Sequence, residues 1–249
     1  MVELFDVQCG FGGVRRGESQ ITTAVQCLEM TGRLKISGAL VRTEPDDLSI
    51  DIELSNRLLF RACAAAPELV PCPVVVPDTG GDLPLAREQV EAHIRAGAGA
   101  ALIRPVVDHW ELSPWVADGL FEALAEHRLP LYCLLRYVSL SQAADIAGRW
   151  PGLPIVLAEL PYGCQRTLYP LLERFTNLHV SVGAVIANHL GLEDLVSRVG
   201  AGRLLFGTGF PMFAPMMALT QLVYAELGEQ DKVAIGAGNW RKLWSEVKR

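Results

Sequence analysis

The sequence predicts one α/β domain, a (β/α)8 (TIM) barrel that takes up residues 1–249. Three observations predict it. Eight short apolar runs alternate with stretches of helical periodicity, no linker or low-complexity segment divides them, and half of the residues are hydrophobic while only 20% are charged. Parallel strands that are covered by helices account for such a composition. A doubly wound open sheet would share the alternation, but it usually carries a phosphate-binding glycine loop after its first strand, and Arg15 stands where the third glycine belongs.

The first half of the chain supplies four strands and four helices. Gly32 is a plausible end of the first helix, and Pro67 stops the second. Prolines make the start of the third strand irregular. Ser113 and Pro114 suit the N-cap and the first position of the fourth helix. The predicted strands are residues 4–8, 35–41, 70–76 and 100–104, and the predicted helices are residues 19–30, 51–66, 85–96 and 114–127.

The second half continues the same alternation. The last predicted strand runs into Gly207, Gly209 and Pro211, which is typical of a buried strand that breaks into a functional loop. Two helices follow it, with a short break around residues 230–235. The predicted strands are residues 131–135, 154–160, 178–182 and 204–207, and the predicted helices are residues 141–149, 167–175, 192–199, 215–227 and 239–247.

Composition argues against several classes of partner. The net charge of −6 disfavours nucleic acids and anionic membranes. No apolar run reaches the ~18 residues that cross a bilayer, and the first residues lack the basic start and apolar core of a signal peptide. Six scattered cysteines without a Cys-x-x-Cys pair read as small buried hydrophobes. We therefore expect a cytoplasmic protein with no membrane and no nucleic-acid partner, and the sequence leaves a homo-oligomer open.

Two stretches near the end of the chain resemble a known family. They are Leu205-Phe206-Gly207-Thr208-Gly209-Phe210-Pro211 and Gly238-Asn239-Trp240-Arg241-Lys242-Leu243. They resemble the phenylalanine-glycine-serine-aspartate-x-proline end of strand eight, and the glycine-asparagine-x-x-arginine-leucine tail, of the amidohydrolase superfamily, in the branch that includes aminocarboxymuconate-semialdehyde decarboxylase. Residues 155–160 and 177–181 also fit the family's pattern. The resemblance covers essentially the whole chain.

The resemblance implies one divalent metal, usually zinc, at the mouth of the barrel. Its ligands in the family are two histidines on strand one, one histidine each on strands five and six, and an aspartate on strand eight. The residues that match these places here are Gln8, Gly10, Leu134, Glu159 and Gly209. Glycine and leucine have no ligand atom, and a glutamine amide is a poor zinc ligand. We therefore expect no metal and no other cofactor.

Catalytic groups of this fold come from the carboxyl ends of the strands. Glu159 is the candidate catalytic residue, because burial at the end of an apolar strand would raise its pKa and suit it to general acid or base work. The alternative is an ion pair with Arg104 or Arg136 that fills the place of the metal. A side-chain period of two puts Ile155, Leu157 and Glu159 on one face of the strand, and the resemblance makes that face the inner one.

Further polar residues share a place at the end of a strand or on the loop after it. The candidate substrate-binding residues are Gln8, Arg104, Arg136, Tyr162, Ser181 and His109. Arg104 and Arg136 would clamp a carboxylate or phosphate of a ligand, and the alternative is packing against acidic loop residues such as Asp108. His109, like His189 on a later loop, fits a surface residue better than a catalytic one.

These residues support two main hypotheses about function. The first is a degenerate amidohydrolase that has lost its metal and keeps a pocket for a small, carboxylate-bearing molecule, or keeps only a scaffold role. The second is a metal-independent hydrolase or lyase on a small organic acid that uses Glu159 as its acid or base. A third hypothesis, an interaction protein that uses the outside of the barrel, stays open, because barrels host many functions.

Overall fold

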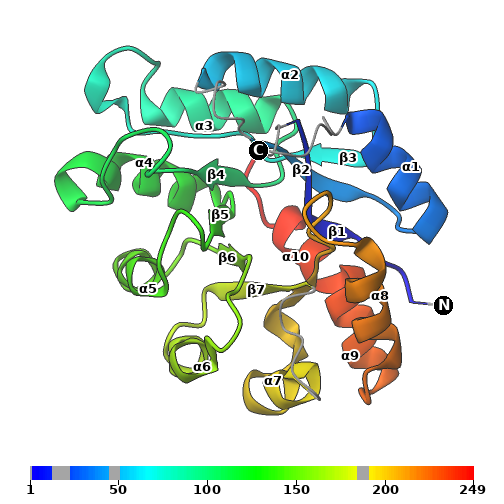
Figure 1. The fold of residues 1–249 in the computed structure, drawn as a ribbon. Coiled ribbons are helices and arrows are strands. Elements are labelled where there is room, and N and C mark those ends of the chain that lie inside the picture. The colour runs from blue at the N-terminus through cyan, green and yellow to red at the C-terminus, as the bar shows by residue number, and fades with distance from the viewer. Residues whose placement is uncertain (1, 13–22, 45–50, 184–190) are drawn as a thin grey trace.

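The computed structural model describes residues 2–12, 23–44, 51–183 and 191–249. Within these ranges eight parallel strands stand at the centre, and the helices surround them in chain order (Figure 1). The strands are β1 (Asp6–Gly12), β2 (Ala39–Glu44), β3 (Leu69–Pro71), β4 (Ala101–Ile103), β5 (Leu131–Leu134), β6 (Ile155–Ala158), β7 (Leu178–Val182) and β8 (Leu204–Phe206). The predicted (β/α)8 barrel is thus confirmed.

The helices lie close to the predicted ranges. They are α1 (Ala24–Leu34), α2 (Ile52–Ala64), α3 (Ala86–Arg95), α4 (Pro114–His127), α5 (Leu140–Arg149), α6 (Gln165–Arg174), α7 (Gly191–Val199), α8 (Pro215–Tyr224), α9 (Glu229–Val233) and α10 (Asn239–Ser245). The predicted break around residues 230–235 is wrong, because α9 and the π-helical turn η3 (Ala234–Gly238) fill it. Residues 19–22 of the first predicted helix lie outside the described residues.

Side chains fix where several helices begin. The hydroxyl of Thr23 accepts a hydrogen bond from the backbone N–H of Gln26 at the start of α1, and Asp51 does the same for α2. Ser113 has the extended backbone of an N-cap, but its hydroxyl donates to Glu111 (3.2 Å) instead of capping α4. The predicted end of the first helix at Gly32 is wrong, because α1 continues to Leu34 and ends at Lys35, whose φ is 55°.

Hydrogen bonds outside the regular ladders close the barrel. Prolines interrupt the strand after Leu69–Pro71, yet Leu102 still donates to the carbonyl of Pro73 (2.8 Å) and accepts from Val75 (2.9 Å), which joins β3 to β4. On the other side, the N–H of Gly209 donates to the carbonyl of Gln8 (2.9 Å), which joins β8 to β1. The ladders β1-β2-β3 and β4-β5-β6-β7-β8 therefore form one continuous barrel.

Alternation along the strands separates two apolar layers. One layer lies between the strands and the helices, and the other fills the barrel lumen. The lumen is plugged at its amino-terminal end by Trp240 of α10, which is buried and stacks on Phe5 with 5.7 Å between ring centres. All six cysteines are free thiols and five are buried, as expected. None of the described helices has the length and apolar character that a membrane crossing requires.

Candidate functional site

Four charged side chains meet at the carboxyl-terminal mouth of the barrel. Arg42 and Glu44 end β2, Arg136 follows β5, and Glu159 follows β6. The carboxylate of Glu44 lies between the two arginines, with Oε1 2.6 Å from Arg42 Nη2 and Oε2 2.6 Å from Arg136 Nη2. Glu159 Oε1 is 3.4 Å from Arg42 Nη2 and 3.3 Å from Arg136 Nη1. We call these four residues the mouth network.

The backbone of Glu159 turns its side chain into the mouth. The prediction that Ile155 and Leu157 face inward is wrong: they pack toward the helices, while Val156 and Ala158 line the lumen. Strict alternation would therefore point residue 159 outward. Glu159 instead has a φ of 60°, in the left-handed region that side chains other than glycine seldom adopt. This turn carries the carboxylate to Arg136, as predicted, and to Arg42.

Burial and charge act differently on the two carboxyl groups of the mouth network. Burial would raise the pKa of Glu44, but Arg42 and Arg136 outweigh it, so that this pKa lies below its ordinary value. For Glu159, burial outweighs the same two arginines, and the pKa is raised. The contacts of Glu159 are also longer than those of Glu44. Glu44 is therefore the firmly ionised member, and Glu159 is the one that takes up a proton more readily.

Arg104 serves a different carboxylate. Of the two candidate partners of Glu159, Arg104 is the wrong one, because it makes two hydrogen bonds to Asp108, from Nε (3.1 Å) and Nη2 (2.8 Å). Both side chains are essentially inaccessible to solvent. Asp108 sits only four residues after Arg104, so this nearby partner satisfies the guanidinium locally. The pair holds the loop between β4 and α4, which was the alternative interpretation from sequence.

The other predicted site residues divide into buried and exposed ones. Ser181 donates a hydrogen bond to Gln8 Oε1 (2.8 Å), and both side chains are buried where this bond joins β7 to β1 across Gly207, at the end of β8. This bond leaves the Nε2 donor of Gln8 for another partner. His109 and Tyr162 are exposed on the loops after β4 and β6. His189 lies outside the described residues.

The five places at which the resemblance expects metal ligands do not form a ligand set. A Cβ atom on Gly10 would lie 2.7 Å from Glu44 Oε1, so the mouth network fills that space. A Cβ on Gly209 would lie 2.6 Å from the ring of Phe213. Leu134 belongs to the apolar lumen. Among the described residues, no three His, Cys, Asp or Glu side chains come together as a metal site. This donor set does not fit a divalent metal.

Sequence reasoning missed Arg42 and Glu44. The second strand was predicted to end at Val41, whereas β2 continues to Glu44. Both residues therefore lie at the carboxyl end of a strand, which is the signal that picked out the other candidates. Tyr132 was missed as well: its side chain lies in the lumen, and its hydroxyl is buried without a hydrogen-bonding partner among the described residues. Burial raises the pKa of Tyr132 well above its ordinary value.

Comparisons with known proteins agree with this architecture. The structure is similar to 2,6-dihydroxybenzoate decarboxylase in complex with 2,6-dihydroxybenzoate (15% identity, TM-score 0.78, 98% of this chain and 99% of that chain). It is also similar to 5-carboxyvanillate decarboxylase from Sphingomonas paucimobilis (13%, 0.74, 98% and 99%). A third similar structure is a probable 2-pyrone-4,6-dicarboxylic acid hydrolase from Acinetobacter baumannii with citric acid bound (11%, 0.73, 98% and 99%).

The sequence itself shows the family. The profile of the amidohydrolase family matches residues 25–245, which is most of the chain. No curated protein sequence matches the chain. The fold is thus that of TIM-barrel decarboxylases and hydrolases, and the chain belongs to the amidohydrolase family.

Proposed function

We propose that the barrel mouth is a metal-independent binding site for a small molecule that bears a carboxylate. One observation carries the proposal: Arg42 and Arg136 hold the carboxylate of Glu44 between them, with one oxygen 2.6 Å from each guanidinium. Two guanidinium groups at this spacing suit a carboxylate of a ligand equally well. The similar structures with 2,6-dihydroxybenzoate and with citric acid support this ligand class.

The two arginines differ in how a ligand can reach them. The side chain of Arg136 is 28% exposed, whereas that of Arg42 is 2% exposed and also donates to the carbonyl of Cys9. Arg136 is therefore the contact for the ligand, and Arg42 supports the site from within. The Nε2 donor of Gln8, left over by the bond from Ser181, supplies a neutral contact.

Charge determines which of the two glutamate carboxylates a ligand carboxylate displaces. The mouth network carries two positive and two negative charges, so it has no net charge when both glutamates are ionised. Glu159 makes the longer contacts and has the raised pKa. A ligand carboxylate that approaches Arg136 therefore replaces Glu159 more easily than Glu44.

A second function, catalysis, rests on the same glutamate. Glu159 contacts both arginines through Oε1 alone, and its side chain is 14% exposed. A partly buried carboxyl group with a raised pKa suits proton transfer to or from a bound acid. In this case the protein would be a hydrolase or lyase that needs no metal, and Glu159→Gln would abolish turnover while the folded protein still binds the acid.

Calorimetric titration with 2,6-dihydroxybenzoate and with citrate tests the binding site. We expect Arg136→Gln to weaken binding by about tenfold or more, because it removes a charge-assisted contact. Arg95→Gln is the matched control, since Arg95 also pairs with a glutamate (Glu91) but lies on the surface of α3. No binding of either acid to the wild type, or equal losses in both variants, would contradict the proposal.

A further inference from the structure

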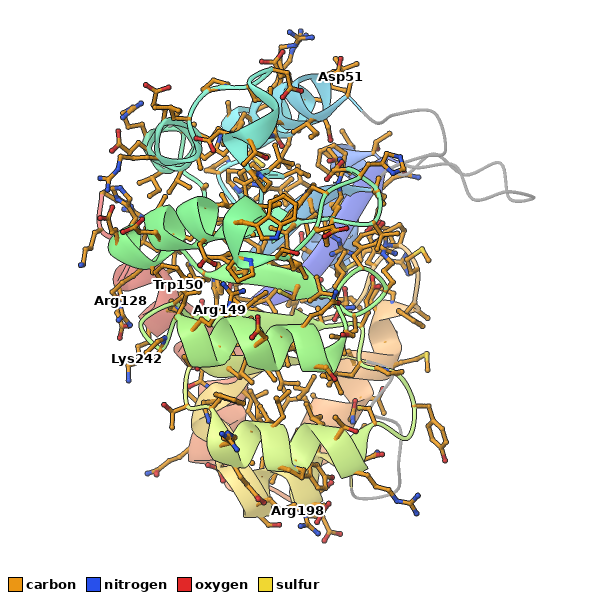
Figure 2. All side chains as sticks on the ribbon, turned by 90° about the vertical axis from the view of Figure 1, so that its left-hand side faces the viewer. Asp51, Arg128, Arg149, Trp150, Arg198 and Lys242 are labelled. Carbon is orange, nitrogen blue, oxygen red and sulfur yellow. The ribbon has the colours of Figure 1, made fainter. Side chains whose placement is uncertain are left out.

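The end of the barrel opposite the mouth has a polar cavity of its own. Its volume is about 300 Å³, and it lies at the amino-terminal ends of β6 and β7, against α10 and the turn after α4. In Figure 2, Arg128 and Lys242 project at this end, while Asp51 marks the mouth end. The cavity and the mouth network therefore lie at opposite ends of the barrel.

The walls of the cavity are fixed by amide side chains. Asn177 donates to the carbonyls of Ala147, Trp150 and Leu153, and Asn239 donates to those of Ala201 and Leu204. The first three bonds tie the start of β7 to the end of α5 and the loop before β6, and the other two tie the start of α10 to the start of β8. The cavity is therefore preformed, which lowers the entropy cost of binding a ligand.

Donors predominate among the charged and titratable groups of the cavity. Lys242 makes no ion pair with the described residues. Arg128 uses one nitrogen, Nη2, to pair with Glu246 (2.6 Å). His179 is largely buried, its Nδ1 has no hydrogen-bonding partner among the described residues, and burial lowers its pKa to about 4. The neutral ring can thus hold its proton at Nε2 and donate to a ligand.

These charges favour an anion. Two cations, one carboxylate and a neutral imidazole leave the lining of the cavity with a net positive charge, although the chain as a whole carries −6. From this cavity, its fixed walls and its unpaired donors, we propose a binding site for a small anion with phosphate or carboxylate groups, held by Lys242, Arg128 and His179. The bound anion would join α10, which plugs the barrel, to β7 and to the end of α4.

Calorimetric titration with inorganic pyrophosphate and with citrate, in matched potassium chloride, tests this proposal. We expect saturable binding of at least one anion, and the tighter one shows whether phosphate or carboxylate is preferred. Lys242→Gln should weaken binding by about tenfold. Lys242 is exposed, so this variant is expected to fold. Arg57→Gln, which removes an exposed cation from α2, should bind as the wild type does.

The mouth also has arginines, so citrate binding alone does not locate the site. Loss of binding in Lys242→Gln, with binding kept in Arg57→Gln, places the anion-binding site in the cavity. Equal affinities in the wild type and Lys242→Gln would overturn the proposal, and so would the absence of saturable binding of both anions. Both titrations are made in the Arg136→Gln background, which removes the proposed ligand contact at the mouth, so that neither result depends on whether the mouth binds an acid.

Discussion

At the scale of single residues, Glu44 and Glu159 show how position decides the role of one side-chain type. Both contact Arg42 and Arg136. Glu44 is 8% exposed and makes two contacts of 2.6 Å, one through each oxygen, whereas Glu159 is 14% exposed and makes contacts of 3.3 and 3.4 Å through one oxygen. The shorter contacts of Glu44 outweigh its burial, and the longer contacts of Glu159 do not.

This difference predicts unequal losses of stability. Glu44→Gln removes the main partner of a buried guanidinium, which costs about 3 kcal/mol by analogy with broken buried pairs. Glu159→Gln removes a carboxylate whose contacts with the same arginines do not outweigh its burial, so we expect a change of less than about 1 kcal/mol. Urea unfolding followed by circular dichroism measures both. A larger loss for Glu159→Gln would show that it, not Glu44, is the main counter-charge.

The opposite pKa shifts predict opposite contributions to the pH dependence of stability. The lowered pKa of Glu44 contributes stability above its ordinary value of 4.5, and this contribution is lost as the pH falls through the lowered value. The raised pKa of Glu159 means that the native state holds that proton more tightly than the unfolded state does. Stability therefore declines as the pH rises from 4.5 through the raised value.

A comparison of variants isolates this second contribution. The free energy of unfolding of the wild type, minus that of Glu159→Gln, should decrease as the pH rises above 4.5. Asp6 and Asp108 also have raised pKa values, but they are present in both proteins and cancel in the difference. Urea unfolding at a series of pH values gives the difference. If this difference instead increases with pH, the arginines affect the pKa of Glu159 more strongly than burial does.

At the scale of elements, the join between β1 and β8 depends on a buried cluster of hydrogen bonds. Asp6 Oδ1 accepts from the N–H groups of Gln8 (2.9 Å) and Thr208 (2.8 Å), and Asp6 Oδ2 accepts from the Thr208 hydroxyl. The same hydroxyl accepts from the N–H of Phe210 (3.1 Å). One threonine thus serves both the closing strand and the loop after it.

Thr208→Val should therefore destabilise the barrel although it keeps the shape of the side chain. It leaves a carboxylate oxygen and an N–H group without this partner, which we expect to cost about 2–3 kcal/mol. Thr31→Val is the matched control: Thr31 is also buried, but its hydroxyl donates only to the carbonyl of Leu28 in the same helix. The loss of stability in Thr31→Val should stay below about 1 kcal/mol. Similar losses in both variants would show that closure does not depend on the cluster.

At the scale of the whole molecule, the sequence predicted the barrel better than the site. Periodicity is a local property, so nearly all of the strands and helices were recovered from it. The mouth network depends on side-chain contacts between the end of β2 and the residues after β5 and β6, which lie far from β2 in the chain. Arg136 was named, but Arg42 and Glu44 were missed because the strand continues three residues beyond its apolar run. The positive φ of Glu159 has no signature in the sequence around it.

The neutral mouth network also leads to a prediction for the whole protein. Arg42 already brings a positive charge to the mouth, and Glu44 fills the space beside Gly10. A divalent cation would add charge next to two guanidinium groups, and the part of the chain that the structure describes has no set of histidines to bind it. We therefore expect the purified protein to contain no stoichiometric metal, and EDTA to change neither its thermal unfolding midpoint nor its affinity for 2,6-dihydroxybenzoate. Elemental analysis and thermal unfolding with and without the chelator make the measurement. A bound metal whose removal lowers both stability and affinity would refute metal-independent binding at the mouth.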